Sequence, residues 1–281
     1  DGVTEGGSPT FDFFQYNDLD NPSASCPTFS YDTATSTGAV DFTRYPCVAE
    51  GLPNENFEYL MRAINTGIVD TDNYILVDVL PFIGDTGVSE LVEGQNRLTE
   101  FLVLATGPIV IEDVTEYGDT GFGAGDRASF TTAQFTVEYN LTTNPCRGQV
   151  ANPPAGQTTY PTGCDDNWFT EAQILVMSPP AWSTNSPSPW DNVRSFRIVQ
   201  NNGTDNLGTG IIPSGGGSLI FSLPMRINGY DGPTPFNAED GAQTGEIAWN
   251  SFAHQFDNAL SGTELLAAEP PKVGIVVAQR Y

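Results

Sequence analysis

Residues 218–226 read SLIFSLPMR and carry apolar side chains at every second position: Leu219, Phe221, Leu223 and Met225. Successive side chains of a β-strand point to opposite faces of a sheet, so this alternation predicts a strand with one face in a core. The same alternation recurs along the chain, whereas helical periodicity is scarce. We therefore expect an all-β protein.

Further segments carry the same signal, and turn-rich stretches separate them. The other expected strands are Thr10–Tyr16 and residues 57–66, 73–80, 98–105, 109–113, 128–139, 172–177, 193–200, 246–253 and 272–279. Short helices are expected at residues 89–97 and 251–260. About eleven strands with turns between them predict an antiparallel β-sandwich with Greek-key connections and long disulfide-stapled loops.

The expected organisation has two parts. Residues 1–56 form an N-terminal leader strand and a disulfide-closed loop, and residues 57–281 form the β-sandwich module. The 11% of aromatic residues provide enough apolar material for a core. One large sandwich and two smaller ones both fit the length, and the proline-rich residues 178–191 are the candidate boundary between two.

Charge excludes several classes of function. Ten basic residues stand against 35 acidic ones, for a formal net charge of −25. Such a surface repels nucleic acid and anionic lipids and attracts cations. No apolar run approaches the ~18 residues of a membrane span, so membrane insertion is not expected. Lys272 is the only lysine and His254 the only histidine, which leaves little equipment for acid–base chemistry.

The four cysteines form two local pairs, Cys26 with Cys47 and Cys146 with Cys164. Each pair brackets a turn-rich loop, which is typical of disulfides. Zinc binding is the competing interpretation, and a single histidine with no close cysteine pair argues against it. Disulfides form in oxidising compartments, so we expect a secreted or surface-exposed protein.

Carboxylates recur in turns beside glycine and asparagine, where they could bind calcium through oxygen ligands. A solvated acidic surface explains the same residues, and no segment matches the EF-hand pattern. Calcium would also reduce the self-repulsion of the chain. The candidate ligands are Asp18, Asp20, Asp70, Asp72, Asp113, Glu116, Asp119, Asp126, Asp165, Asp166, Glu239 and Asp240.

The same carboxylates could serve a glycosidase, with Trp168, Trp182, Trp190 and Trp249 stacking on sugar rings. Nothing in the sequence places two carboxylates opposite each other, however, and nucleophile and cofactor motifs are absent. We therefore expect a protein that is not an enzyme. A secreted carbohydrate-active enzyme is the second alternative.

Three residues have a specific chemical interpretation beside an ordinary one. Lys272 could form an isopeptide crosslink with an Asn or Asp side chain, although a solvated lysine at the start of a strand is favoured. Asn140 in NLT and Asn202 in NGT match the acceptor pattern for N-glycosylation.

Four stretches resemble the β-sandwich repeat modules of bacterial surface proteins and adhesins (the DUF11-type and SdrD-B-like group). They are ILVDVLPFIGDTGV at 75–88, preceded by RAINTG at 62–67; VEYNLTTNPC at 137–146, followed by CDDNW at 164–168; EIAWNSFA at 246–253; and EPPKVGI at 269–275. The resemblance implies an extracellular, non-catalytic module for adhesion, cell-wall display or matrix building. It does not cover residues 1–56.

The segment Thr10–Tyr16, TFDFFQY, follows a polar leader and could pair within its own sheet or add to the sheet edge of a neighbouring subunit. The last strand, 272–279, is a candidate for that receiving edge. No sorting signal follows this strand, and we expect a filament or matrix subunit that polymerises through Phe11, Phe13, Phe14 and Tyr16. The first alternative is a monomeric adhesin module that binds a glycan or protein ligand.

Overall fold

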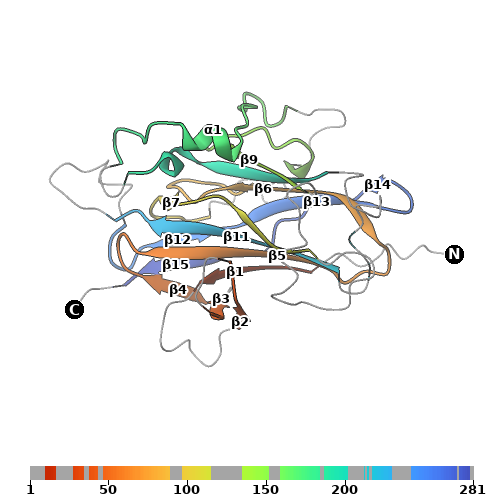
Figure 1. Cartoon of the computed structure of the whole chain (residues 1–281), viewed down its shortest axis with the longest axis horizontal. Coiled ribbons are helices and arrows are strands. Elements are labelled where there is room, and N and C mark those ends of the chain that lie inside the picture. Colours follow the sequence, from red (N-terminus) through yellow and green to blue (C-terminus); the bar gives the residue numbers. More distant parts are fainter. Residues whose placement is uncertain are drawn as a thin grey trace.

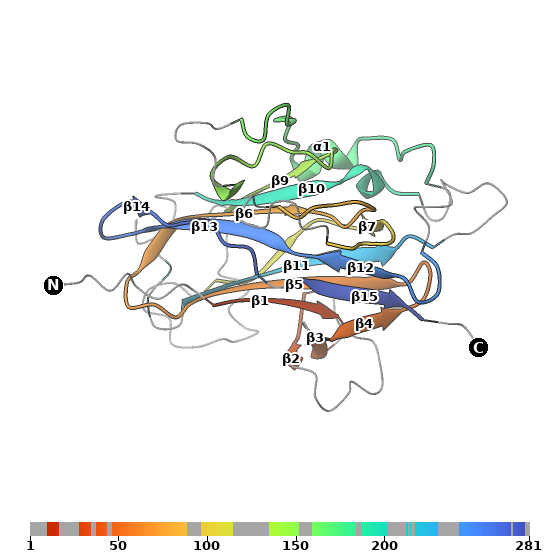
Figure 2. The same cartoon turned by 180° about the vertical axis from the view of Figure 1, so that it is seen from behind.

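The computed structural model confirms the expected fold class: several antiparallel sheets and one short α-helix (Figures 1 and 2). It describes residues 10–16, 28–34, 38–43, 47–88, 97–114, 135–151, 159–183, 187–201, 212, 214, 217–229, 242–270 and 272–278, and of residues 10–16, 28, 113, 114, 149 and 151 the backbone only. Residues 89–96, most of one expected helix, lie outside these ranges.

The largest sheet forms one layer of the molecule. Its strand order is β2 (Thr28–Tyr31), β3 (Val40–Thr43), β1 (Thr10–Tyr16), β5 (Asn56–Asn65), β11 (Gly217–Ile227) and β7 (Val103–Ala105), and β8 (Val110–Val114) also pairs with β11. The longest ladder is antiparallel and joins β5 to β11 from Asn56 to Asn65. The segment SLIFSLPMR thus lies next to the middle of this sheet.

A five-stranded sheet forms the facing layer. Its order is β14 (Thr263–Glu264), β13 (Phe252–Asn258), β6 (Thr71–Val79), β10 (Ser195–Gln200) and β9 (Phe135–Asn140). The helix α1 (Glu171–Leu175) and the 3₁₀ turns η3 (Gly148–Ala151) and η4 (Pro189–Asn192) lie outside the sheets. A third sheet has the order β12 (Ile247–Asn250), β15 (Val273–Val277) and β4 (Val48–Gly51).

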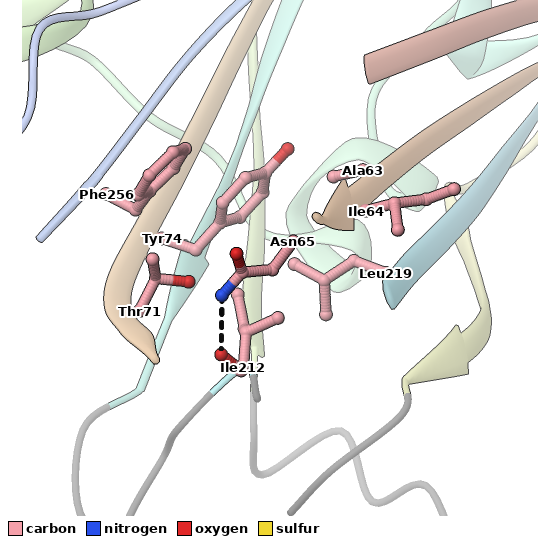
Figure 3. A pocket seen from close by; sticks show the side chains of 8 residues that line it. All are labelled: Ala63, Ile64, Asn65, Thr71, Tyr74, Ile212, Leu219 and Phe256. Carbon is pink, nitrogen blue, oxygen red and sulfur yellow. Dashed lines mark hydrogen bonds between the residues drawn. The ribbon is translucent and has the colours of Figure 1, made fainter. Parts of the chain in front are cut away.

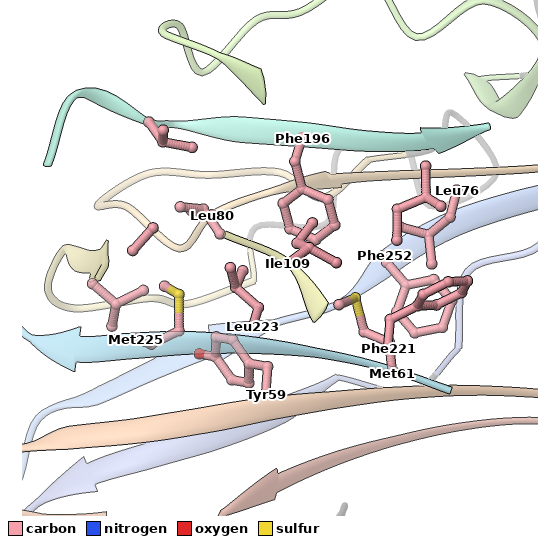
Figure 4. Packing of buried hydrophobic residues seen from close by; sticks show 14 of the residues in the cluster. Tyr59, Met61, Leu76, Leu80, Ile109, Phe196, Phe221, Leu223, Met225 and Phe252 are labelled. Carbon is pink, nitrogen blue, oxygen red and sulfur yellow. The ribbon is translucent and has the colours of Figure 1, made fainter. Parts of the chain in front are cut away.

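One hydrophobic cluster fills the space between the layers (Figure 4). The alternating residues of β11, such as Phe221 and Leu223, meet Leu76 of β6 and Phe196 of β10 there. The cluster includes residues before and after the proline-rich stretch 178–191, with Trp190 itself buried in it.

Both sheets are also covered on their outer faces. Phe42, Leu60 and Ile220 form a second cluster outside the largest sheet, with Phe29, Tyr31 and Val40 packed against it. Val77, Val79, Val88, Val150, Ala253 and Ala267 form a third cluster, with Ile75 and Phe82 packed against it. As a result, β6 and β13 are buried on both faces, and their burial patterns do not alternate cleanly.

The chain changes sheets at Ser251. β12 ends at Asn250 in the three-stranded sheet, and β13 begins at Phe252 in the five-stranded sheet. Corners of this kind let one segment contribute to two packed sheets. The single strand expected at residues 246–253 is therefore two strands, and the helix expected at 251–260 is wrong because β13 occupies most of it.

Another expected strand is also wrong. Residues 172–177 contain most of α1, whose only buried residue is Ile174. Thr170 and Gln173 form a capping box at its start, which favours a helix over a strand. The four short strands β2, β3, β4 and β14 were not expected at all.

The strand β1 pairs within its own chain. Its residues Thr10–Gln15 are opposite Ile64–Tyr59 of β5, and Gln15 and Tyr16 are opposite Thr43 and Phe42 of β3. The expected receiving edge at the C-terminal strand is wrong, because β15 lies between β12 and β4 and both of its edges are paired.

Candidate functional site

Three segments that are far apart in the sequence meet around Arg97. They are residues 78–88, which end β6 and form the next loop; residues 249–251, at the corner between β12 and β13; and residues 269–272, which lead into β15. The resulting Arg97 cluster consists of Asp78, Asp85, Arg97, Asn250, Ser251, Glu269 and Lys272. Three of the four stretches that resemble adhesin modules thus contribute to one site.

The guanidinium of Arg97 is buried and bonded to both sides of the site. Its Nη1 donates to the carbonyl oxygen of Val79 at 2.8 Å and to Oδ1 of Asn250 at 3.1 Å. Its Nη2 donates to the carbonyl oxygen of Ser251 at 2.7 Å. Buried carbonyl groups need hydrogen-bond partners, and Arg97 provides one at the corner where the chain changes sheets.

Two further carboxylates surround the guanidinium. Oδ1 of Asp85 lies 3.6 Å from Nε of Arg97, and Oε1 of Glu269 lies 3.9 Å from Nη2. Glu269 also accepts hydrogen bonds from the hydroxyl of Ser251 and from the backbone N–H of Val88. These contacts tie the loop after β6 to the segment before β15.

The third carboxyl group of the cluster, Asp78, is fully buried. Its Oδ2 accepts a hydrogen bond from Nδ2 of Asn250 at 2.9 Å. Burial raises the pKa of Asp78 to about 7, although Arg97 and Asn250 act in the opposite direction. Burial also raises the pKa of Asp85. The site can therefore hold or release a proton near neutral pH.

Lys272 closes the cluster on its outer side. Its Nζ donates to the carbonyl oxygen of Arg97 at 2.6 Å and lies 4.5 Å from the centroid of the Trp249 ring. Burial is the main effect on this amine and lowers its pKa. These contacts are those of a lysine that packs over an aromatic ring. An isopeptide crosslink stays a prediction.

The remaining stretch that resembles adhesin modules, residues 137–146 with 164–168, contains Asn140, which is fully buried. Its Nδ2 donates to the carbonyl oxygens of Asp165 at 3.2 Å and Asn167 at 3.0 Å, and its Oδ1 accepts from the N–H of Thr142 at 2.9 Å. This is the amide that the glycosylation pattern marks, and backbone groups occupy it in the folded chain. Asn202 lies outside the described residues.

The disulfide between Cys146 and Cys164 is present beside this site, with the two Cα atoms 4.8 Å apart. It joins the segment after β9 to the segment that bonds Asn140. Cys47 is disulfide-bonded as well, and Cys26 lies outside the described residues.

The predicted calcium ligands do not come together in the part of the chain that the structure describes, where no three metal-ligating side chains form a group. Three of them accept hydrogen bonds from N–H groups: Asp70 from Ser214 at 2.7 Å, Asp165 from Asn167 at 2.9 Å, and Asp166 from the Trp168 indole at 3.1 Å. Asp18, Asp20, Glu116, Asp119, Asp126, Glu239 and Asp240 lie outside the described residues, as does the side chain of Asp113.

Asp72 is opposite another carboxylate. In the ladder between β6 and β13 its cross-strand partner is Asp257, whose Oδ2 accepts from Nδ2 of Asn73 at 2.7 Å. Burial, followed by the charge of Asp257, raises the pKa of Asp72. Like charges directly opposite each other destabilise a sheet.

The tryptophans predicted as sugar platforms already pack against protein groups. Trp190 is buried edge-on against Tyr139, and the rings of Trp168, Trp182 and Trp249 pack against Arg197, Arg194 and Lys272 respectively.

A cavity between the sheets is too small for an organic ligand (Figure 3). It measures about 10 Å³, roughly the room that one water needs. Its lining includes Asn65, whose Nδ2 donates to the carbonyl oxygen of Ile212 at 3.1 Å, and the buried ring of Tyr74. We therefore assign no substrate to it.

No protein-family model matches the chain, and no curated protein matches it significantly. Among the described residues, no helix is both long and apolar enough to cross a membrane. The family resemblance stays a prediction.

Reasoning from sequence missed most of the Arg97 cluster. Arg97 belongs to no motif, and its contacts come from segments up to 175 residues away. The available signal was that three of the quoted stretches each carry acidic or amide side chains beside an apolar run.

Proposed function

We propose that the protein is a non-enzymatic extracellular structural or adhesive subunit that assembles with its own copies by exchanging β1. The observation that supports this proposal is the position of β1. This strand lies at the N-terminal end of the fold and pairs with β5 over six consecutive residues. The opposite edge of β5 is paired with β11 over ten residues.

Without β1, residues Tyr59–Ile64 of β5 would present unpaired N–H and C=O groups. Such an edge is a template for a strand from another chain. The β1 strand of a second copy can pair there in the same antiparallel register, because an exchanged element makes the contacts that it makes within its own chain.

The place next to β5 suits a strand with apolar residues on both faces. Tyr59 and Met61 of β5 belong to the core between the layers, whereas Leu60 belongs to the cluster outside the largest sheet. In the six residues FDFFQY, 11–16, each face carries two aromatic residues and one polar residue. A strand of this composition has aromatic residues on both faces, as a place between two apolar clusters requires.

The disulfide Cys146–Cys164 supports the extracellular part of the proposal, because disulfides persist in oxidising environments. Calcium remains part of the proposal through the net charge of −25, which a divalent cation would partly neutralise. Electron microscopy of the protein with calcium, and then with EDTA, tests whether the chain assembles and whether assembly needs calcium. Calcium-dependent fibres support the proposal, and single particles in both conditions favour the monomeric adhesin.

Engineered crosslinking tests the exchange of β1 directly. Asp12 and Arg62 are cross-strand partners, so we would prepare the single variants Asp12→Cys and Arg62→Cys and oxidise them together. A disulfide between two chains requires that β1 of one copy lies beside β5 of another. The double variant is the positive control for the register within one chain, and Glu50→Cys mixed with Asp12→Cys is the negative control, because Glu50 is exposed on β4.

Exchange predicts a crosslinked species containing both variants, and deletion of residues 1–16 should abolish any fibres. If the mixture yields only uncrosslinked chains while the double variant closes internally, β1 stays in its own chain and the proposal fails. Fibres that persist without residues 1–16 would contradict it equally.

A further inference from the structure

The carboxyl group of Asp78 lies in an environment that disfavours a negative charge. It is fully buried, and its cross-strand neighbours are Phe196 of β10 and Phe252 of β13. Oδ2 accepts from Asn250, and Oδ1 has no hydrogen-bond partner among the described residues. A buried carboxylate with an unpaired oxygen is unfavourable, whereas a buried carboxylic acid is tolerated far better.

The positive charges near Asp78 are bonded to other groups. Arg97 donates to Val79, Asn250 and Ser251 and pairs with Asp85 and Glu269 instead. Lys272 donates to the carbonyl oxygen of Arg97. Among the described residues, the negative charges of Glu269 and Asp85 raise the pKa of Asp78 further. Tyr59 of β5 also interacts with Asp78, and it stays neutral because burial raises its pKa well above the usual value.

The formal charges of the Arg97 cluster cancel only when Asp78 is protonated. Asp85 and Glu269 then balance Arg97 and Lys272, and ionisation of Asp78 leaves one uncompensated negative charge in the interior. Removing the balance of a buried ion cluster is strongly destabilising.

We propose that the Arg97 cluster is a proton-dependent junction between the sheets, which is firm when Asp78 carries a proton and weakens when that carboxyl group ionises. The junction connects the end of β6, the corner at Ser251 and the segment before β15. Its weakening therefore loosens the contact of the five-stranded sheet with the three-stranded sheet. This inference is independent of how the chain assembles.

The pH range follows from the direction of the pKa shift. The folded chain holds the proton of Asp78 up to about pH 7, whereas the unfolded chain releases it near pH 4. Stability from this group is therefore fully present below about pH 4 and decreases as the pH rises toward and through 7. Between pH 6 and 8 the unfolding equilibrium constant should rise about tenfold because of Asp78 alone.

The variant Asp78→Asn tests the inference, because an amide has the shape of the protonated acid and no charge. Urea unfolding of the wild-type chain and of the Asp78→Asn variant is measured at pH 6 and pH 8. The ratio of their unfolding constants should change about tenfold between the two values. Glu50→Gln, at an exposed position of β4, is the matched control and should show no such change. Comparison at equal pH removes the contribution of His254, which is common to both chains.

An unchanged ratio would overturn the inference. Carbonyl ¹³C NMR of the wild-type chain gives a second test that does not depend on folding of the variant. The signal of a buried carboxyl group should titrate near pH 7, and titration of every aspartate near pH 4 would overturn the inference as well.

Discussion

Nη2 of Arg97 lies 2.7 Å from the carbonyl oxygen of Ser251, the residue at which the chain leaves the three-stranded sheet and enters the five-stranded sheet. A buried cation thus bonds the backbone at a corner of the fold. The same guanidinium reaches the end of β6 through Val79, so one side chain fixes the relative position of two sheets.

Replacing Arg97 with methionine should lower the free energy of unfolding by about 3–5 kcal/mol, because Asp85 and Glu269 would lose their buried counter-ion. Urea unfolding measures the loss. Arg197→Met is the matched control: Arg197 pairs with Glu138 at a partly exposed position, and its removal should cost no more than about 1 kcal/mol. Equal losses in the two variants would show that the Arg97 cluster has no special role.

His254 should make the protein less stable in acid. Burial lowers its pKa well below the usual value, and its ring stacks on Tyr74 and Phe256. Below about pH 6.5 His254 binds a proton in the unfolded chain but not in the folded chain. The free energy of unfolding therefore falls by up to about 1.4 kcal/mol per pH unit. Denaturant unfolding at pH 7.5 and 5 should show that His254→Phe lacks this loss; identical pH dependence in both chains would contradict it.

Asp72→Asn should stabilise the sheet at pH 7 by a few tenths of a kcal/mol, because it removes the like charge opposite Asp257. The raised pKa of Asp72 means that the repulsion is absent in acid and appears as the pH rises, so the gain should vanish near pH 3. Thermal unfolding at the two pH values measures it. In a double-mutant cycle, Asp257→Asn should add little once Asp72 is replaced; full additivity would rule out direct repulsion.

Asn140→Ala should destabilise the fold by about 1–3 kcal/mol, because the variant leaves two buried carbonyl groups, those of Asp165 and Asn167, without this donor. Asn144→Ala is the control: Asn144 is exposed, and its side-chain amide donates to the carbonyl oxygen of Gly163 at the long distance of 3.5 Å. Chemical unfolding should separate the two variants clearly. If they unfold alike, the amide of Asn140 contributes nothing that water cannot replace.

Strands with a clear apolar alternation could be predicted from the sequence even where both faces are buried, as in β11, and strands without this alternation could not. The alternation of Leu219, Phe221 and Leu223 correctly located β11. In β13 the residues Phe252–Phe256 are all buried, since a separate hydrophobic cluster covers the outer face, and no period of two remains. The segment therefore read as a helix.

Sites assembled from distant segments could not be predicted from the sequence either. Asp78 and Asn250 are 172 residues apart, and each looks ordinary in its own segment. The pairing of Cys146 with Cys164 was predictable because it is local and depends on a rare residue type. The partners of Arg97 depend on which strands pair and where the chain turns, and the sequence pattern does not record either.

The direction of β1 has a mechanical consequence. In Figure 2, β1 begins to the left of β15, and β15 ends near the right-hand end of the molecule, so these two points lie apart along the direction of the strands. Tension applied between these two points acts along the strands, so the hydrogen bonds between β1 and β5 would be sheared together and not peeled apart one at a time. A subunit joined to its neighbours through β1 would resist pulling best along the axis of the chain of subunits.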